Sequence, residues 1–346
     1  MGRRILITGL ASFWGGQVAQ AFEQDPSVEA VVGMDTDDPV VELERTEFVR
    51  TDDSYSILAR LVRATQVDTV VHAGLVVNSA LMGDRRLHEK NVIGTMNLLA
   101  AIGAEESRVS SLVVKSAALV YGASSQDPAW FREDCRRSFP AQTRIERSLL
   151  EVEDYLRSFA EEYRAVRVAV LRCANVLGED LVTSFSRALT LPLTPTIAGF
   201  DPQLQFVEQD DVVRAIEFAV TRELEGVFNV AGDGRLPWSE IRTMTGRPPL
   251  LLSPVGTRLA ASTLSRLRVI KLPPEMLDLL RYGRGIDNRK LKQAGFEYRY
   301  TSAGALQHFI EHQRLRRVIP DAGPAYHYQG DVEAFFRHSP SIVRDH

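Results

Sequence analysis

A glycine-rich turn near the N-terminus has the residue types of a phosphate-binding site. In ILITGLASFWGG, Gly9 and Gly15 stand between a short apolar run and the start of a helical pattern. The first glycine permits a tight turn, and the last lets the helix pack closely on the sheet, so that the helix N-terminus offers its N–H groups to a pyrophosphate. Ser12 takes the place of the middle glycine, where a side chain crowds the phosphate. The spacing predicts a dinucleotide site, and the alternative is an ordinary tight turn.

An acid follows where the ribose of a dinucleotide needs one. Asp35 ends the next apolar run, VVGMD, about 20 residues after the last glycine. At that place a carboxylate accepts a hydrogen bond from the ribose 2′-hydroxyl and repels a 2′-phosphate. The residues that follow are TDD and include no base. The pattern favours NAD over NADP, with a surface turn acid as the alternative.

The elements that must position these residues follow a βαβ rhythm. Short β-rich runs alternate with segments of helical spacing through the first half of the chain, which predicts a parallel sheet covered by helices. We expect strands at residues 4–8, 28–35, 47–50, 67–73, 111–116 and 166–171, and helices at 14–23, 55–65, 85–104 and 143–162. Segments rich in proline and glycine follow, and a helix at 209–222 and a strand at 226–230 are expected to return to the first domain.

The predicted fold class is therefore α/β, a doubly wound Rossmann-type parallel sheet with a smaller, discontinuous C-terminal substrate lobe. The dinucleotide-binding domain is expected to comprise residues 1–172 and about 205–232, and the lobe about 173–204 and 233–318. Residues 319–346 lack periodicity and are expected to form a tail.

Composition excludes several classes of function. The 346 residues are 45% hydrophobic and 25% charged with a net charge of −4, so the chain is globular and has no broad basic field for nucleic acid. Two cysteines, Cys135 and Cys173, form no disulfide framework, which favours a reducing cytoplasmic setting. The N-terminal apolar run is too short to span a bilayer.

Two further features have a plain interpretation. His308 and His312 lie one helical turn apart, but no third metal ligand accompanies them, so we predict a solvated helix face and no metal. The basic amphipathic segment 257–270 is interpreted as a helix over the substrate cleft, with contact to a membrane surface as the alternative.

The motifs together resemble a known family. TGLASFWG, VDTVVHAG, NVIGTMNLL, KSAALVYG, LRCANVLG, QFVEQDDVVRAI and GVFNVAGDG occur in this order over residues 3–310. The order resembles that of the extended short-chain dehydrogenases/reductases of the NAD-dependent epimerase/dehydratase family. That family includes UDP-galactose 4-epimerase, and the likeness is greatest to its divergent actinobacterial members.

The resemblance implies a set of site residues. It implies NAD contacts from Gly9, Gly15 and the backbone of Ser12, Phe13 and Trp14, from Asp35 to ribose, from Asp52 or Asp53 to adenine, and from Ala73, Gly74, Asn91 and Ser116. It implies contacts to a nucleotide-sugar substrate from Asn175, Gln205 and Arg281, and a homodimer through the helices at 85–104 and 143–162. The alternatives are that Asn91 ties a helix to a loop and that Ser116 satisfies a strand end.

The catalytic residues of the resembled family are missing. Its members move a proton with a Tyr followed four residues later by a Lys, and with a Ser or Thr four residues before the tyrosine of VYG. Here Ala117 takes the Ser/Thr position, and Thr143 and Arg147 align with the Tyr and the Lys. The chain has five lysines, and none follows a tyrosine by four residues.

Two functions remain open. Arg147 can hold the nicotinamide ribose, but arginine is a fixed cation that cannot shuttle protons. The first function is an epimerase, dehydratase or reductase whose proton relay has moved, with Glu146, Glu151, Tyr155 and Tyr163 as candidates on the same helix. The second is a non-catalytic dinucleotide-binding regulatory or scaffold protein.

Overall fold

A parallel seven-stranded sheet forms the centre of the protein. The computed structural model describes residues 2–78, 82–255 and 272–318. The strands are β1 (Arg3–Thr8), β2 (Val28–Asp35), β3 (Thr46–Arg50), β4 (Thr69–His72), β5 (Ser111–Ala117), β6 (Arg167–Cys173) and β11 (Gly226–Val230). Their order is β11-β6-β5-β4-β1-β2-β3, and every neighbouring pair is parallel. This order confirms the predicted doubly wound Rossmann-type sheet.

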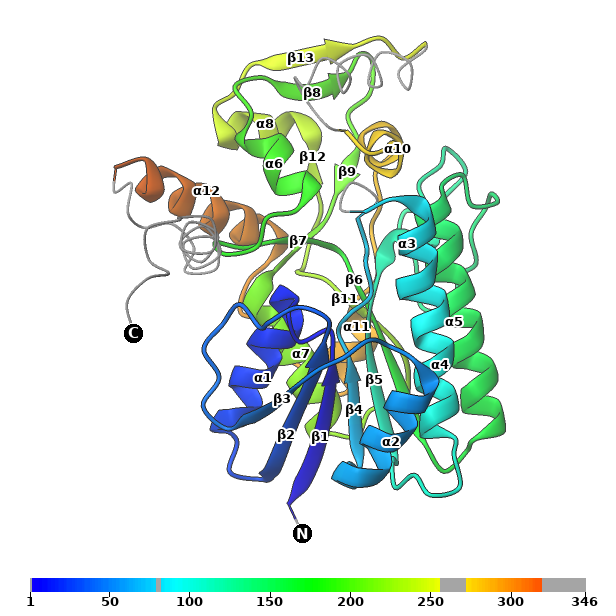
Figure 1. Ribbon diagram of the computed structural model, residues 1–346. Coiled ribbons are helices and arrows are strands. Elements are labelled where there is room, and N and C mark those ends of the chain that lie inside the picture. The colour runs from blue at the N-terminus through cyan, green and yellow to red at the C-terminus, as the bar shows by residue number, and fades with distance from the viewer. Residues whose placement is uncertain (1, 79–81, 256–271, 319–346) are drawn as a thin grey trace, which may run out of the picture.

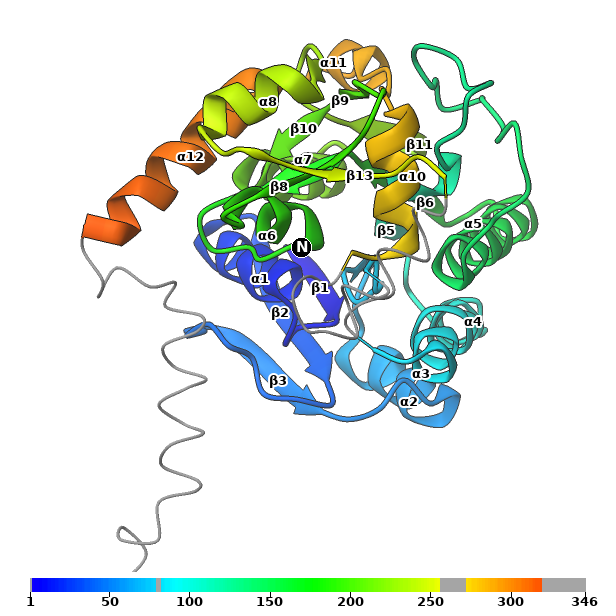
Figure 2. The ribbon, with the colours of Figure 1, turned by 90° about the horizontal axis from the view of Figure 1, so that it is seen from above.

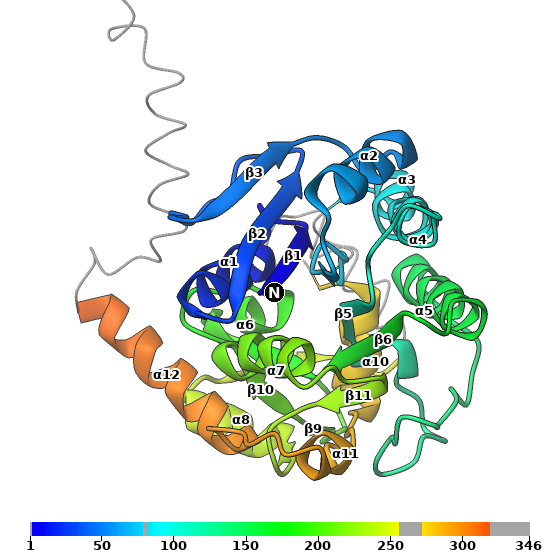
Figure 3. The ribbon, with the colours of Figure 1, turned by 90° about the horizontal axis from the view of Figure 1, so that it is seen from below.

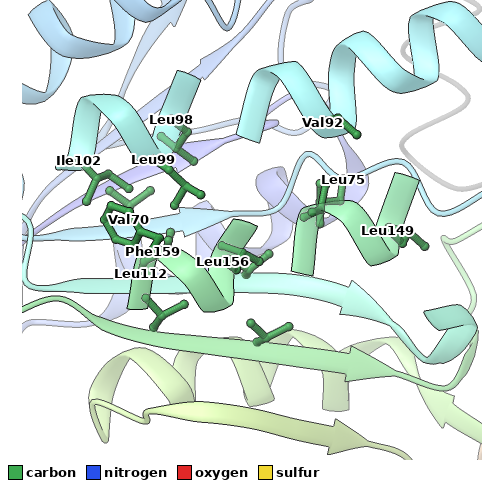
Figure 4. Close-up of a cluster of buried hydrophobic side chains, with 14 of the residues drawn as sticks. Val70, Leu75, Val92, Leu98, Leu99, Ile102, Leu112, Leu149, Leu156 and Phe159 are labelled. Carbon is green, nitrogen blue, oxygen red and sulfur yellow. The ribbon is translucent and has the colours of Figure 1, made fainter. Parts of the chain in front are cut away.

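Helices cover both faces of the sheet (Figures 1 and 3). On one face lie α1 (Phe13–Gln24) and α7 (Gln209–Thr221), and on the other α2 (Tyr55–Thr65), α4 (Gly94–Ile102) and α5 (Arg144–Glu162). Figure 4 shows Leu98 and Leu99 of α4 and Leu156 and Phe159 of α5 packed near Val70 of the sheet. Full burial of each such side chain stabilises the folded state by about 1.5–3 kcal/mol.

The predicted elements hold, with one difference. The sequence predicts one helix at 85–104, but the chain forms α3 (Asp84–His88), a π-helical turn η1 (Glu89–Ile93) and then α4. A tertiary contact accompanies the irregular turn: the Asn91 amide donates to the carbonyl of Val76 and accepts from its N–H, both at 2.8 Å. A π turn of this kind often marks a functional site.

The C-terminal lobe is built from short, discontinuous pieces above the carboxyl ends of the strands (Figures 1 and 2). Its strand pairs are β7 (Asn175–Leu177) with β10 (Phe206–Glu208), β8 (Thr194–Ile197) with β13 (Pro249–Leu252), and β9 (Gln203–Leu204) with β12 (Leu236–Pro237). Its helices are α6 (Ser184–Thr190), α8 (Trp238–Thr245), α10 (Pro274–Tyr282) and α12 (Ser302–Val318), with α11 (Arg289–Gln293) beside β11. Phe185, Phe206 and Trp238 centre its own core.

Two sequence predictions fall on residues outside the described chain. The amphipathic segment at 257–270 and the tail from 319 lie outside the described residues. Within the described part, no helix is long and apolar enough to cross a membrane.

A buried histidine joins β1, β4 and α4. Thr95 Oγ1 donates to the carbonyl of Asn91 at 2.5 Å, so His72 Nε2, 3.1 Å from Thr95 Oγ1, must be the donor to that hydroxyl. His72 Nδ1 then accepts from Thr8 Oγ1 at 2.6 Å. Burial, with help from the charge of Lys90, lowers the pKa of His72 to about 4. The ring is therefore neutral in the folded protein at neutral pH.

We expect His72 to weaken the fold in acid. The pKa of His72 is lower in the folded protein than in the unfolded chain, so protons bind preferentially to the unfolded chain. The contribution of neutral His72 to the free energy of unfolding is therefore complete above pH 6.5 and is lost as the pH falls towards 4. The loss is about 1.4 kcal/mol per pH unit, or about 2 kcal/mol between pH 6.5 and 5. Urea unfolding at pH 7.5, 6 and 5 should show this slope in the wild type and a flatter one in His72→Gln. The exposed His88→Gln should keep the wild-type slope, and equal slopes in all three proteins would contradict the assignment.

Candidate functional site

The strand order reverses between β1 and β4, and two glycines lie in close contact there. Gly9 follows β1 with a φ of +78°, and a Cβ on it would lie 2.3 Å from the Cα of Gly74, which follows β4. No residue with a side chain fits at Gly9. In open α/β sheets, ligands bind outside the carboxyl ends of the strands at such a switch point.

The turn from β1 into α1 explains why a serine replaces the middle glycine. Ser12 is the N-cap of α1: its Oγ accepts from the N–H of Gly15 at 3.1 Å and donates to the carbonyl of Gly9 at 2.6 Å. A Cβ on Gly15 would lie 2.2 Å from the Gly9 carbonyl oxygen, so the helix starts directly against the turn. The N–H groups of Phe13 and Trp14 are in the first turn, where no acceptor within the helix exists, and they suit an anion.

Asp35 is fixed against this turn by the backbone. Its Oδ2 accepts from the N–H of Ala11 at 3.0 Å, and its Oδ1 accepts from the N–H of Thr36 at 2.8 Å. The residue is only 6% exposed, although it is charged. Lys90 Nζ lies 3.4 Å from Oδ1, a partner that sequence reasoning did not identify. The carboxylate is thus held in one orientation beside the glycine turn.

Asp52 and Asp53 follow β3 and differ in environment. Asp52 is exposed, and its hydrogen bonds to Ser54, whose N–H donates to Oδ1 at 3.1 Å, lower its pKa. Burial raises the pKa of Asp53, Lys90 opposes the rise, and Asp35 and Asp52 add to it. A Cβ on Gly94 of α4 would lie 3.3 Å from Asp53 Oδ2. Of the pair, Asp53 is the one enclosed by the fold.

Two of the polar residues expected to line the cofactor are bonded within the protein. The Asn91 amide is held on both sides by the backbone of Val76. Ser116 Oγ donates to Glu153 Oε1 at 2.8 Å. Ala73 donates its N–H to the carbonyl of Thr8 at 3.1 Å and so continues the β1–β4 contact towards Gly74.

The start of α5 does not direct the aligned catalytic positions inwards. Thr143 is the N-cap, in a capping box with Glu146, and its hydroxyl accepts from the N–H of Glu146 at 3.3 Å. Arg147 is exposed, and its Nε donates to the carbonyl of Thr143 at 3.4 Å. The buried carboxylate of this turn is Glu146, whose Oε2 accepts from the N–H groups of Gln142 and Thr143 and from Arg137 Nη2. Glu146 is thus primarily a capping group.

A cavity of about 320 Å³ lies beside this helix start, between the segment 123–127, the segment 137–146 and α10. Volumes of this order are typical of small-molecule sites. Arg137, Glu146 and Arg281 line it, together with the aromatic rings of Tyr121, Phe139 and Tyr282. The Arg281 guanidinium lies 4.9 Å from the ring centroid of Phe200, and its buried Nε has no hydrogen-bond partner among the described residues.

A buried ionic network connects the strand ends to this cavity. Arg172 of β6 binds Glu153 of α5 with Nη2–Oε2 at 2.5 Å and Nε–Oε2 at 3.0 Å. Its Nη1 also donates to the Tyr121 hydroxyl at 2.7 Å, and that hydroxyl donates to Asn229 Oδ1 at 2.9 Å. Tyr121 belongs to the 3₁₀ turn η2 (Ala118–Tyr121), and burial raises its pKa to about 12. This phenol is therefore neutral and fixed at neutral pH.

The three predicted substrate residues do not come together at the cavity. Asn175 Nδ2 donates to the carbonyl of Gln205 at 3.0 Å. The Gln205 amide is buried, donates to the carbonyl of Gly232 at 2.9 Å and accepts from the N–H of Ile286 at 2.8 Å. These two amides brace the junction between sheet and lobe, and of the three only Arg281 lines the cavity.

Lys115 is a buried cation in β5 that the sequence patterns did not identify as special. It is 2% exposed, its Nζ lies 4.6 Å from the ring centroid of Trp14, and burial lowers its pKa. The described residues give its Nζ no hydrogen bond or ion pair. A cation–π contact of up to about 2 kcal/mol offsets only part of the desolvation of an ammonium.

Lys115→Met is expected to raise the free energy of unfolding by about 1–2 kcal/mol, because the substitution removes a desolvated charge and keeps a long apolar stem. Chemical denaturation at pH 7.5 measures the change. Lys292→Met, which removes only an exposed ion pair with Asp233, should change stability by less than about 0.5 kcal/mol. Destabilisation by Lys115→Met would show that the charge is compensated.

The histidines of α12 are engaged with acids. His312 Nδ1 lies 2.7 Å from Glu179 Oε2, and His308 Nδ1 lies 3.8 Å from Glu208 Oε1. The ring of His308 also stacks on that of Tyr300, with the ring centroids 5.1 Å apart. Among residues 2–78, 82–255 and 272–318, no group of three or more His, Cys, Asp or Glu side chains could hold a metal ion.

Comparison with known proteins gives consistent results. The profile of the NAD dependent epimerase/dehydratase family matches residues 5–231. An uncharacterized protein of Mycobacterium tuberculosis is 32% identical over 321 residues, covering 91% of this chain and 85% of its own.

Solved structures share the fold. The dTDP-glucose 4,6-dehydratase of Bacillus anthracis, in complex with NAD, has a TM-score of 0.68 at 17% identity and covers 91% of this chain and 97% of its own. The UDP-glucose 4-epimerase of Thermotoga maritima, with UDP-glucose, has a TM-score of 0.68 at 21% identity and covers 91% and 99%. The UDP-glucuronic acid 4-epimerase of Bacillus cereus, in complex with NAD, has a TM-score of 0.69 at 17% identity and covers 90% and 99%.

Proposed function

Because the chain belongs to the NAD dependent epimerase/dehydratase family, we propose that it is an NAD-binding protein related to the nucleotide-sugar epimerases and dehydratases, with a degenerate catalytic site. The observation that carries the proposal is the switch point, where the glycine turn, the first turn of α1 and Asp35 converge. Solved structures with this fold, such as the Bacillus anthracis dehydratase, hold NAD.

The residues at the switch point fit a dinucleotide. The tight approach of Gly9 to Gly74 and Gly15 keeps the surface free of side chains where a pyrophosphate would reach the first turn of α1. The hydroxyl of Ser12 is hydrogen-bonded to the N–H of Gly15 and the carbonyl of Gly9, so its side chain lies against the turn. Asp35 would take the adenosine ribose hydroxyls, which favours NAD over NADP, and Asp53 would take the adenine amine.

The cavity beside α5 fits the substrate side of the proposal. Arg281 and Arg137 offer guanidinium groups, which suit phosphate oxygens, beside three aromatic rings. We therefore place a nucleotide sugar there, with Arg281 towards its diphosphate.

The same proposal includes a homodimer and a cytoplasmic setting. The dimer would form through η1, α4 and α5, where the apolar side chains of Ile93 and Met96 are 42% and 40% exposed.

A second, non-catalytic function is favoured by the start of α5. When bound, NAD would supply hydride transfer, and a residue of this chain would have to move a proton at the substrate hydroxyl. Thr143 and Glu146 cap the helix, Arg147 is exposed, and the Tyr121 phenol is held by Arg172 and Asn229. These contacts support a regulatory or scaffold role in which the dinucleotide is bound and not turned over.

Calorimetric titration of the purified protein with NAD, NADH and NADPH tests the proposal, together with a search for cofactor that copurifies. We expect NAD and NADH to bind and NADPH to bind much more weakly. Binding of no dinucleotide would sink the proposal and leave a fold without its ligand. A screen of nucleotide sugars with the NAD-loaded protein then separates the two functions, since rapid turnover would rule out the non-catalytic role.

A further inference from the structure

A lysine distant in sequence reaches the acid that would select the cofactor. Lys90 and Asp35 are 55 residues apart, and their Nζ and Oδ1 lie at 3.4 Å. The Lys90 side chain is 31% exposed and that of Asp35 is 6% exposed, so the pair lies at the rim of the switch-point site. The residues after β2 supply no base, and the fold supplies one from η1.

The position of Lys90 is built into the fold. The next residue, Asn91, locks the π-helical turn to the backbone of Val76 with two hydrogen bonds of 2.8 Å. The charge of Lys90 acts on both enclosed acids of this region, since it pairs with Asp35 and opposes the burial that raises the pKa of Asp53. The other nearby base, Arg50, is the register partner of Asp35 on β3, but it is 59% exposed and forms an ion pair with Asp38.

We propose that Lys90 is a latent phosphate-binding residue that, together with Asp35, sets discrimination between NAD and NADP. An ammonium binds phosphate as a point charge. While Asp35 is present, Lys90 is paired and the carboxylate remains to receive ribose hydroxyls and to repel a 2′-phosphate. When Asp35 is removed, Lys90 is released and pairs with the 2′-phosphate of NADP. The inference rests on the proposed dinucleotide site and adds a determinant that the sequence around Asp35 does not contain.

A double-mutant cycle tests this coupling. The dissociation constants of NAD and NADP are measured by calorimetry at fixed salt for the wild type, Asp35→Ala, Lys90→Met and the double variant, with Lys292→Met as the control. We expect Asp35→Ala to tighten NADP binding at least ten-fold, and the added Lys90→Met to cancel that gain. In the Asp35-containing protein, Lys90→Met should weaken NADP binding by less than about three-fold, since the lysine is already paired there. Lys292→Met should leave both constants unchanged.

The outcomes separate the inference from the proposed function. NADP binding that is equally tight in Asp35→Ala and in the double variant would overturn the role of Lys90, even if NAD binds the wild type well. Binding of neither dinucleotide by any of the proteins would overturn the proposed function and the inference with it. If Asp35→Ala fails to fold, Asp35→Asn replaces it in the cycle, because the amide keeps the shape of the side chain and one acceptor for the Ala11 or Thr36 N–H.

Discussion

Arg172→Met is expected to lower the free energy of unfolding by about 3–5 kcal/mol, because it leaves the Glu153 carboxylate buried without its cation. The two side chains are only 13% and 9% exposed, and the guanidinium binds the carboxylate through two nitrogens. The substitution also removes the donor to the Tyr121 hydroxyl. Urea or guanidinium unfolding at pH 7.5, followed by circular dichroism, measures the change.

The double variant Arg172→Met/Glu153→Leu identifies the cause. If the loss arises from an uncompensated buried charge, removing both partners should restore most of the stability, since a well-packed apolar pair is close to neutral against a buried ion pair. The control is Arg157→Met on α5, the helix that also carries Glu153. It removes an exposed ion pair with Asp154 and should change the free energy of unfolding by less than about 0.5 kcal/mol. A loss below about 1 kcal/mol in Arg172→Met would contradict the importance of the network.

The parts of the fold that the sequence predicts are those governed by local patterns. The alternation of apolar runs and helical spacing predicts the strands of the main sheet to within two or three residues, and the strand at 226–230 matches β11. The spacing along the sequence is enough to predict the roles of Gly9, Gly15 and Asp35, because one turn and two neighbouring strands bring them together.

The parts that the sequence leaves out depend on partners far along the chain. The apolar pattern of 85–104 is continuous, and the π turn that divides it coincides with the contact of Asn91 with Val76. The pairs Lys90–Asp35 and Arg172–Glu153 join residues 55 and 19 positions apart, and neither pair shares a local motif. The aligned positions Thr143 and Arg147 likewise do not indicate that Glu146 is the buried carboxylate of that turn.

Asp35→Ala is expected to weaken NAD binding by about 10- to 100-fold. A hydrogen bond from a ribose hydroxyl to a charged acceptor contributes about 1.5–3 kcal/mol, and each 1.4 kcal/mol corresponds to about ten-fold in affinity. The carboxylate is already oriented by the N–H groups of Ala11 and Thr36, so little ordering is needed when the ribose binds. Calorimetric titration with NAD measures the loss.

A neighbouring acid provides the matched control for this prediction. Asp37 is exposed two residues further on, so Asp37→Ala removes the same charge from the same region without touching the fixed carboxylate. Its effect on NAD affinity should stay within about two-fold, because exposed charges are screened by salt. Equal losses in the two variants would mean that general electrostatics controls binding. An unchanged affinity in Asp35→Ala, with the wild type binding tightly, would remove Asp35 from the ribose site and with it the argument for NAD over NADP.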